Sequence, residues 1–201
     1  MTDGLDEKTI DPDPIRQFEA WFNDAMAAKL PLPEAMTLAT ATPDGKPSAR
    51  MVLLKQVDHD GFVFYTNYHS AKAEQLDDNP NAALVFYWAT LDRQVRVEGT
   101  VVRTTVEESR DYFKTRPRES QIGAWASAQS EVISSRDVLE QRAKELEAQY
   151  LDREIDRPEH WGGYRVIPER IEFWKSRVGR LHDRILYERS GNGWTISRLA
   201  P

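Results

Sequence analysis

The feature that most constrains the fold is an alternation of apolar and polar residues, with a period of two, over residues 35–104. Successive side chains of a β-strand point to opposite faces, so this period predicts strands that bury one face. Turn sequences at 43–47 and 58–61 separate the first runs and leave no room for a helical crossover. Consecutive strands joined in this way form an antiparallel sheet.

Helical signals flank and interrupt these strands. Asp13 as N-cap, Pro14 at the first helical position and apolar residues at three- and four-residue steps predict a helix to about Lys29. Thr105 and Glu108 have the spacing of a capping box. Further helices are expected over 70–78, 105–115 and 135–150, strands return over 163–175 and 184–199, and the polar stretch 116–134 predicts neither.

This order of elements predicts a mainly β protein with peripheral helices (α+β). A closed or split antiparallel β-barrel is favoured because closure removes exposed strand edges. Residues 13–201 are expected to form a single domain, preceded by a mobile arm over residues 1–12, which have little apolar content. A chain of 201 residues can bury a core without metals or disulfides.

Composition excludes several classes of function. The chain has no cysteine, and its four histidines lack the spacing of metal ligands, so we expect no metal. It has no apolar run near the roughly 20 residues that span a bilayer, and its start is acidic, so we expect a cytoplasmic protein without a membrane partner. A net charge of -6 argues against a nucleic-acid partner.

Two segments predict anion binding near the first strands. Arg50 and Lys55 bracket a continuous apolar run, which reads as a buried strand whose cations meet an anion. Lys72 lies in the first turn of the helix over 70–78, where free N–H groups and positive potential favour a phosphate. Both segments have a plainer alternative, namely cations that reach solvent at a strand end or after a helix cap.

Two further groups extend this pattern. Tyr112, Arg116 and Ser120 follow one another at four-residue spacing, so a phenol, a guanidinium and a hydroxyl could converge on one anion. On an extended chain Arg180, His182 and Arg184 share one face, and such neighbouring cations favour an anion between them. A solvated arginine and a charged, solvent-facing strand are the open alternatives. No nucleophile elbow or pair of catalytic carboxylates accompanies these groups.

Taken in chain order, these segments resemble the pyridoxamine/pyridoxine 5'-phosphate oxidase family from about Pro14 to Pro201. The resemblance is carried by RMVLLK at 50–55, FYTN at 64–67, RQV at 93–95, the run from Tyr112 through RPR at 116–118 to SQIGAW at 120–125, QS at 129–130, IEFW at 171–174, RLHDR at 180–184 and RLAP at 198–201.

The resemblance implies a split β-barrel that works as a homodimer, with FMN in each of two interface sites. One subunit would bind FMN through Arg50, Met51, Val52, Leu53, Lys55, Tyr65, Thr66, Lys72 and Gln94. The other would contribute Gln129, Ser130, Trp174 and Arg184. The substrate phosphate would be held by Lys55, Tyr112, Arg116 and Ser120, with Arg180 and His182 over the pyridine ring as the catalytic residues.

The implied reaction is oxidation of pyridoxamine or pyridoxine 5'-phosphate to pyridoxal 5'-phosphate, with hydride transfer to the flavin and oxygen reduced to hydrogen peroxide. Two departures stand out, because Ala71 replaces a residue that usually contacts the FMN phosphate, and the arm lacks a segment that often covers the site. Alternatives are a related flavin oxidase acting on another ring, as in phenazine biosynthesis, a non-catalytic flavin or pyridoxal-phosphate carrier, and a single-strand binder using Phe86, Tyr87 and Trp88.

Overall fold

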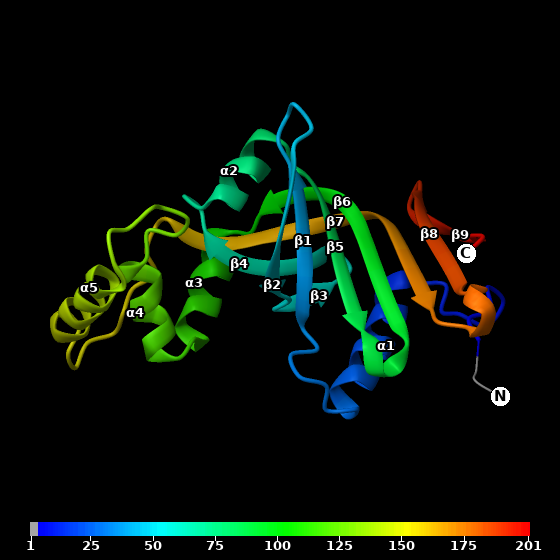
Figure 1. Cartoon of the computed structure of the whole chain (residues 1–201), viewed down its shortest axis with the longest axis horizontal. Helices are drawn as coiled ribbons and strands as arrows, with labels where there is room; N and C mark the ends of the chain where they lie inside the picture. Colours follow the sequence, from blue (N-terminus) through cyan, green and yellow to red (C-terminus); the bar gives the residue numbers. More distant parts are fainter. Residues whose placement is uncertain (1–3) are drawn as a thin grey trace.

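The computed structural model describes residues 4–201, so the first three residues of the expected mobile arm lie outside the described part (Figure 1). Its elements are α1 (Pro14–Ala27), β1 (Ala35–Ala41), β2 (Pro47–Leu53), β3 (Gln56–Asp58), β4 (Gly61–Asn67), α2 (Ala71–Asp78), β5 (Asn81–Trp88), β6 (Arg93–Arg103), α3 (Val106–Thr115), α4 (Arg118–Ala126), α5 (Arg136–Gln149), β7 (Trp161–Lys175), β8 (Asp183–Ser190) and β9 (Gly193–Arg198), with short 3-10 turns at Ala89–Leu91 and Val178–Arg180.

The strands form one antiparallel sheet in the order β2-β1-β5-β6-β7-β4-β3, and β8 and β9 extend it from β7. The strand β7 joins its parts, because it pairs with β6 along one edge and with β4 and then β8 along the other. A register shift between Glu98 and Gly99 bends the β6–β7 pair. The hairpin turn predicted over 190–193 is confirmed by the pairing of Ser190 with Gly193.

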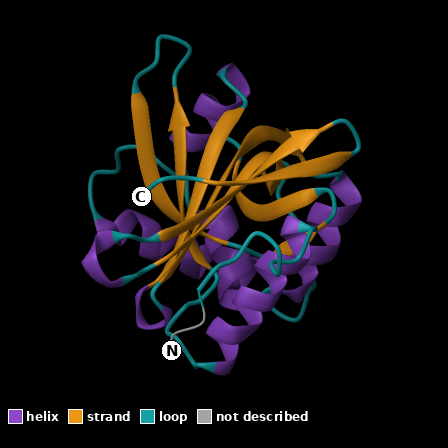
Figure 2. Ribbon diagram, turned by 90° about the vertical axis from the view of Figure 1, so that its right-hand side faces the viewer, coloured by secondary structure: helices purple, strands orange, loops and turns teal. Residues whose placement is uncertain are grey.

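The sheet curls until its two ends meet. The backbone N–H of Leu54 donates to Glu34 O (2.9 Å), and that of Lys55 donates to Val63 O (2.8 Å), so the chain leaving β2 attaches to β4. Figure 2 shows the strands curled together with the helices at the periphery. The prediction of a mainly β, antiparallel barrel with peripheral helices is confirmed. No helix in the described part of the chain is long and apolar enough to cross a membrane.

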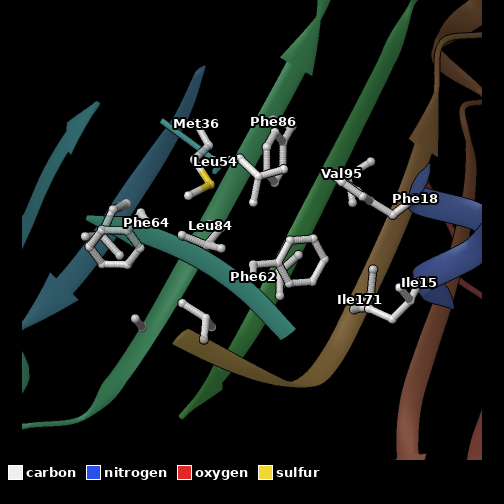
Figure 3. Close-up of a cluster of buried hydrophobic side chains, with 14 of the residues drawn as sticks. Ile15, Phe18, Met36, Leu54, Phe62, Phe64, Leu84, Phe86, Val95 and Ile171 are labelled. Carbon is white, nitrogen blue, oxygen red and sulfur yellow. The ribbon is translucent and has the colours of Figure 1, made fainter. Parts of the chain in front are cut away.

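Helix α1 supplies a central part of the core. Asp13 accepts a hydrogen bond from Ile15 N (2.9 Å), which confirms the predicted N-cap. The ring of Phe18 then meets those of Phe62 and Phe86, each at a centroid distance of 4.9 Å. Figure 3 shows Phe18 reaching from the helix toward side chains of the sheet. The helix is therefore held by aromatic packing against strands from distant parts of the sequence.

A second, smaller core lies under α3 and α4. The capping box of Thr105 and Glu108 starts α3 as predicted, and Pro117 separates it from α4. Sequence reasoning missed α4 because its first residues are polar, although Ile122 and Ala126 are buried. The apolar face predicted for the helix over 135–150 is only partly covered, since α5 has no buried residue and contacts this core through partly buried Ala143, Leu146 and Tyr150.

Two local predictions are wrong. The strand after Arg50 is not buried, because β2 ends the sheet path and leaves Met51 62% and Leu53 36% exposed. Residues 180–184 are not one extended segment either, since Arg180 has φ +61° at the end of a 3-10 turn and β8 begins at Asp183. Both errors arise from tertiary context, which residue periodicity does not contain.

The described part of the N-terminal arm lies against β8 and β9. Tyr187 donates its hydroxyl to Asp11 O (2.6 Å). Arg198 donates to Leu5 O (2.6 Å) and pairs with Glu7 (2.7 Å). These bonds define where the arm docks, while its mobility stays a prediction.

Replacing Phe18 with alanine tests the aromatic core. Phe18 is fully buried, so Phe18→Ala should lower the free energy of unfolding by about 3–5 kcal/mol through lost burial and the cavity left behind. Met26 on the same helix is 52% exposed, and Met26→Ala should change it by less than about 0.5 kcal/mol. Urea unfolding followed by tryptophan fluorescence measures both, and equal losses would contradict this account of α1.

Candidate functional site

One cavity gathers most of the residues predicted to bind ligands. It has a volume of about 590 Å³ and lies between β2, β4 and the helices α2, α3 and α4. From the predicted cofactor set it is lined by Met51, Val52, Leu53, Lys55, Tyr65, Thr66, Lys72 and Gln129. From the predicted substrate set it is lined by Lys55, Tyr112, Arg116 and Ser120. The resemblance implied that these distant segments lie close together, and in the described chain they line one cavity.

Lys72 lies in this cavity with only neutral partners. Its Nζ donates to Gln129 Oε1 (2.8 Å), Thr66 Oγ1 (3.1 Å) and Ser70 Oγ (3.2 Å). Among residues 4–201 no carboxylate lies within ion-pair distance of it. Burial, and secondarily the charge of Arg50, lower its pKa to about 8. An anion in the cavity would therefore relieve an uncompensated positive charge.

Arg50 lies outside the lining of the cavity and adds to the positive potential around Lys72. The guanidinium of Arg50 donates to Thr40 Oγ1 (2.6 Å), Ser48 Oγ (2.6 Å) and Gln75 Oε1 (3.0 Å), which are all neutral acceptors. Desolvation lowers the pKa of Arg50 from its usual value. Arg50 does not line the cavity itself, so it acts on an anion there through its charge and through the groups it orders.

The far wall of the cavity is aromatic and ends in a second cation. Tyr65 stacks on Tyr112 (4.1 Å between centroids) and on Trp161 (5.3 Å). Burial raises the pKa of Tyr65 to about 12, so its phenol stays protonated. The guanidinium of Arg116 lies over the Trp161 ring at 4.5 Å.

Arg116 has an unsatisfied donor in this wall. Its Nη1 is buried and has no hydrogen-bond partner among residues 4–201, and burial lowers the pKa of the group. A buried, unpaired guanidinium nitrogen is costly unless an acceptor arrives. Tyr112 and Ser120 line the same wall, although α3 ends at Thr115 and α4 carries Ser120, so their spacing converges through a break between helices.

The remaining predicted residues form a second group at the ends of β6, β7 and β8. Gln94 pairs with Trp174 across β6 and β7, and Trp174 pairs with Arg184 across β7 and β8. The His182 ring lies 4.7 Å from that of Trp174, and Arg180 is exposed beside it. Arg184 is held by Glu172 through two bonds of 2.8 and 3.0 Å, which raise its pKa.

The two groups lie far apart in one chain. Figure 1 places β8 and β9 at one end of the long axis and α3, α4 and α5 at the other. Trp161 in the cavity and Trp174 in the second group lie at the two ends of β7, about 40 Å of strand apart at roughly 3.3 Å per residue. None of Gln94, Trp174, Arg180, His182 and Arg184 lines the cavity.

Within one chain, three residues lie beside other partners than the subunit assignment implied by the resemblance would group them with. Gln129 bonds Thr66 and Lys72 of its own chain, and Ser130 Oγ accepts from Ala71 N (3.2 Å). Both therefore belong with the cavity group. Gln94 belongs instead with Trp174. The loop over 127–135 folds back onto α2, which sequence order does not reveal. Which subunit supplies each residue to a bound ligand stays a prediction.

A larger cavity of about 820 Å³ lies on the outer side of α3 and α4 and has several arginines in its wall. Two of these arginines are bonded to backbone carbonyls. Arg118 donates to the carbonyls of Tyr150 (2.5 Å) and Arg153 (3.0 Å). Arg157 likewise donates to Pro158 O (3.1 Å). The smaller cavity, with its unsatisfied Arg116 and uncompensated Lys72, is the better candidate for an anion site.

Sequence reasoning gave no role to two residues. Trp161 supports both Arg116 and Tyr65, but one tryptophan among six offered no signal beyond its size. Glu172 is 6% exposed and binds both Arg184 and Arg96, at 3.2 Å for the latter. An acidic residue inside an apolar strand was the available signal, because such a carboxylate is buried only with partners.

Comparison with known families covers most of the chain. Residues 22–150 match the model described as pyridoxamine 5'-phosphate oxidase. Residues 161–201 match the one described as the pyridoxine 5'-phosphate oxidase C-terminal dimerisation region. The first match contains the cavity group except for Trp161, and the second contains Trp161, Trp174, His182 and Arg184.

Curated relatives and solved structures agree with these matches. A pyridoxine/pyridoxamine 5'-phosphate oxidase of Rubrobacter xylanophilus is 61% identical and covers 98% of this chain and 91% of the relative. One from Nostoc sp. is 57% identical, over 99% of this chain and 94% of the relative. PhzG from Burkholderia lata, solved with tetrahydrophenazine-1-carboxylic acid, is 32% identical with a TM-score of 0.93, covering 99% of this chain and 98% of that one. An FMN-binding protein of Nostoc punctiforme related to pyridoxamine 5'-phosphate oxidase, 18% identical with a TM-score of 0.75, covers 95% of this chain and 100% of its own and shares the fold.

The charge of Lys72 should leave a signature in the pH dependence of stability without ligand. Its pKa is about 8 in the folded protein and 10.5 in the ordinary state, so between these values the unfolded chain binds the extra proton and stability rises with pH. The difference in unfolding free energy, Lys72→Met minus wild type, should therefore fall as the pH is raised from 8 to 10.

Urea unfolding at a series of pH values measures this difference. Lys46→Met is the matched control, because the Lys46 side chain is 81% exposed and its removal should give a difference without this trend. A flat or rising difference for Lys72→Met would contradict the assignment of an uncompensated charge to the cavity.

Proposed function

The chain belongs to the pyridoxamine 5'-phosphate oxidase family, and we propose that it is an FMN-dependent oxidase that converts pyridoxamine or pyridoxine 5'-phosphate to pyridoxal 5'-phosphate. The observation that carries the proposal is a pair of cationic side chains in one cavity, Lys72 at one wall and Arg116 at another, with the charge of Arg50 acting on Lys72 from outside the lining. Among the described residues, none of these three cations has a carboxylate partner. Two separate phosphate sites suit a cofactor and a substrate that each carry one phosphate.

The cavity residues fit FMN. Lys72 would hold its phosphate, with Arg50 adding charge from behind and Thr66 and Gln129 keeping the lysine in place. The exposed apolar side chains of Met51 and Leu53 offer a surface for the flavin ring. Held by these residues, FMN would supply the acceptor for a hydride from substrate C4', and its electrons would pass to oxygen to give hydrogen peroxide.

The aromatic wall fits the substrate phosphate. The free Nη1 of Arg116 would donate to it, with Tyr112 and Ser120 as hydroxyl donors and Lys55 at the mouth. Burial raises the pKa of Tyr112, which keeps its phenol a donor at neutral pH. Stacking on Trp161 fixes the plane of the Arg116 guanidinium, so that binding loses little further freedom.

In the net reaction the substrate loses a hydride from C4' and a proton from its amine or hydroxyl group. An imine formed from the amine is hydrolysed to the aldehyde and ammonia, and oxygen takes up the two electrons and two protons. Arg180 and His182 are the proposed catalytic residues, which would orient the ring so that C4' meets the flavin. We also propose a cytoplasmic location, as expected from the sequence.

A homodimer would complete the site. The residues that line the cavity (the cavity group) lie far from the second group, which is named here the Trp174 group. The segment that matches a dimerisation region contains Trp174 and the members of its group from β7 onward. We therefore propose that Gln94, Trp174, Arg180, His182 and Arg184 of one subunit face the cavity of its partner. The exposed Met51 and Leu53 would be covered in that assembly.

A second candidate is an oxidase of another ring substrate. The likeness to PhzG, which was solved with tetrahydrophenazine-1-carboxylic acid, favours it at 32% identity over nearly the whole chain. The unsatisfied Arg116 beside Tyr112 and Ser120 favours a phosphorylated ring instead. Ala71, whose side chain adds no charge beside Lys72, leaves a non-catalytic carrier as a third candidate.

Anaerobic reduction of the flavin tests the proposal directly. Pyridoxamine 5'-phosphate added to the FMN-loaded protein should bleach the visible flavin absorption, which should return on admitting air. Arg116→Met should retain FMN yet need at least about tenfold more substrate, because a charge-assisted bond to phosphate is lost. Bleaching by tetrahydrophenazine-1-carboxylic acid alone would favour the second candidate, and no bleaching with bound flavin would favour a carrier.

Mixing impaired variants, assayed at a substrate concentration low enough that each alone shows little activity, tests the shared site. Arg116→Met and His182→Ala alter different groups, so an equal mixture of refolded chains should recover about a quarter of wild-type activity, since about half the dimers are mixed and each has one intact site. Arg116→Met mixed with Lys72→Met, both in the cavity group, should recover none. Failure of the first mixture, with mixed dimers present, would contradict a site built from two subunits.

A further inference from the structure

The loop between β7 and β8 fixes the orientation of His182. The backbone N–H of Arg177 donates to His182 Nδ1 at 3.1 Å. A backbone N–H can only donate, so Nδ1 must present its lone pair. The single proton of the neutral ring therefore lies on Nε2, for which no described residue provides a hydrogen-bond partner.

Asp183 closes the same loop from its other end. Its Oδ2 lies 3.3 Å from Arg177 Nε, and its Oδ1 accepts from Arg198 Nη1 at 2.8 Å. The N–H of Leu5 in the N-terminal arm also donates to Oδ2 (3.2 Å). The side chain of Asp183 is only 14% exposed, whereas those of Arg177 and Arg198 are 35% and 40% exposed, so the carboxylate is the more shielded partner of each pair.

The turn that these bonds hold has little other support. Val178 is 97% and Leu181 72% exposed, and Gly179 and Arg180 both have positive φ, at +71° and +61°. Two consecutive left-handed residues, one of them not glycine, persist only where their surroundings impose them. Here the bonds of Arg177 and Asp183 contribute to this, together with the backbone bond from Ser176 N–H to Asp92 O (2.9 Å).

The Trp174 ring completes the environment of His182. It lies 4.7 Å away at an angle of 42° and covers the imidazole from the β7 side. With Nδ1 occupied and Trp174 on that side, Nε2–H is the polar group left for a ligand. An imidazole held in this way offers a donor, whereas a general base would need the lone pair on the atom facing the substrate.

Resting on the proposed function, we infer that His182 acts as the Nε2–H tautomer, donating a hydrogen bond to the substrate, and that Arg177 and Asp183 are positioning residues that fix this tautomer. The proton given up by the substrate amine then passes to water and not to His182. His182 therefore contributes orientation, in the sense of placing C4' for hydride loss.

The tautomer can be observed without any turnover. Two-bond proton–nitrogen NMR correlations on ¹⁵N-labelled, FMN-loaded protein at pH 8 should show a pyrrole-type Nε2 and an unprotonated Nδ1, with the signals of His182 identified by their loss in His182→Gln. A protonated Nδ1, or equal populations of both tautomers, would overturn the inference. Because no substrate is present, this result stands apart from the success or failure of the proposed oxidase.

Conservative variants separate a donor from a base. The Gln amide nitrogen reaches near the position of Nε2 and that of Asn near Nδ1, so His182→Gln should lower kcat by less than about tenfold and His182→Asn by more. Loss of a general base would instead cost about 100-fold or more in both variants. Equal, large losses with FMN still bound would refute the donor role.

The positioning role of Asp183 has its own readout. Asp183→Ala should allow both tautomers of His182 in the same NMR experiment and lower kcat, while Asp183→Asn, which keeps an oxygen acceptor, should restore most of the Nε2–H signature. A residue that only stabilised the fold would lower the unfolding free energy and leave the tautomer unchanged. Such a result would remove Asp183 from the proposal.

Discussion

The pairing of β7 with three strands is the constraint on which the rest of the structure depends. Its first half is bonded to β4, its second half to β8, and its other edge to β6. One continuous strand therefore carries Trp161 into the cavity at one end and Trp174 to the opposite end of the molecule. Although a register shift bends the β6–β7 pair, the two ends of β7 stay far apart, so the two groups of one chain do not approach each other. In the proposed homodimer, a second copy of the chain would bring the two groups together.

The cations near the cavity have other hydrogen-bond partners than cations elsewhere in the chain. Arg50 and Lys72 are surrounded by hydroxyl and amide oxygens, which satisfy their N–H groups without neutralising their charge. Arg116 is held by the face of Trp161 and keeps one nitrogen unbonded. Other arginines receive a carboxylate, as partly buried Arg184 does from Glu172, or backbone carbonyls, as Arg157 does. Anion sites and structural ion pairs are thus distinguished by the partners that the fold supplies.

Local chemistry made much of this architecture predictable from sequence. The N-cap of Asp13, the capping box of Thr105 and Glu108, and the turn at 190–193 depend on neighbouring residues and were predicted correctly. The exposure of Met51 depends on β2 being an edge strand, and the grouping of Gln129 with Lys72 depends on a loop folding back. These are long-range outcomes, which periodicity and spacing do not encode. For the site, spacing identified Tyr112, Arg116 and Ser120, whereas Trp161 and Glu172 acquire their roles only through tertiary contacts.

The termini converge on the loop that carries His182. Arg198 near the C-terminus binds both Asp183 and Glu7, and Leu5 of the arm binds Asp183 as well. The described part of the arm therefore contacts this region through the backbone of Leu5 and the carboxylate of Glu7. Each surface ion pair alone contributes little free energy. Because they share the carboxylate of Asp183, these contacts form a network. The network reaches Arg177, whose backbone N–H binds His182. Its geometry therefore matters more for the site than its contribution to stability.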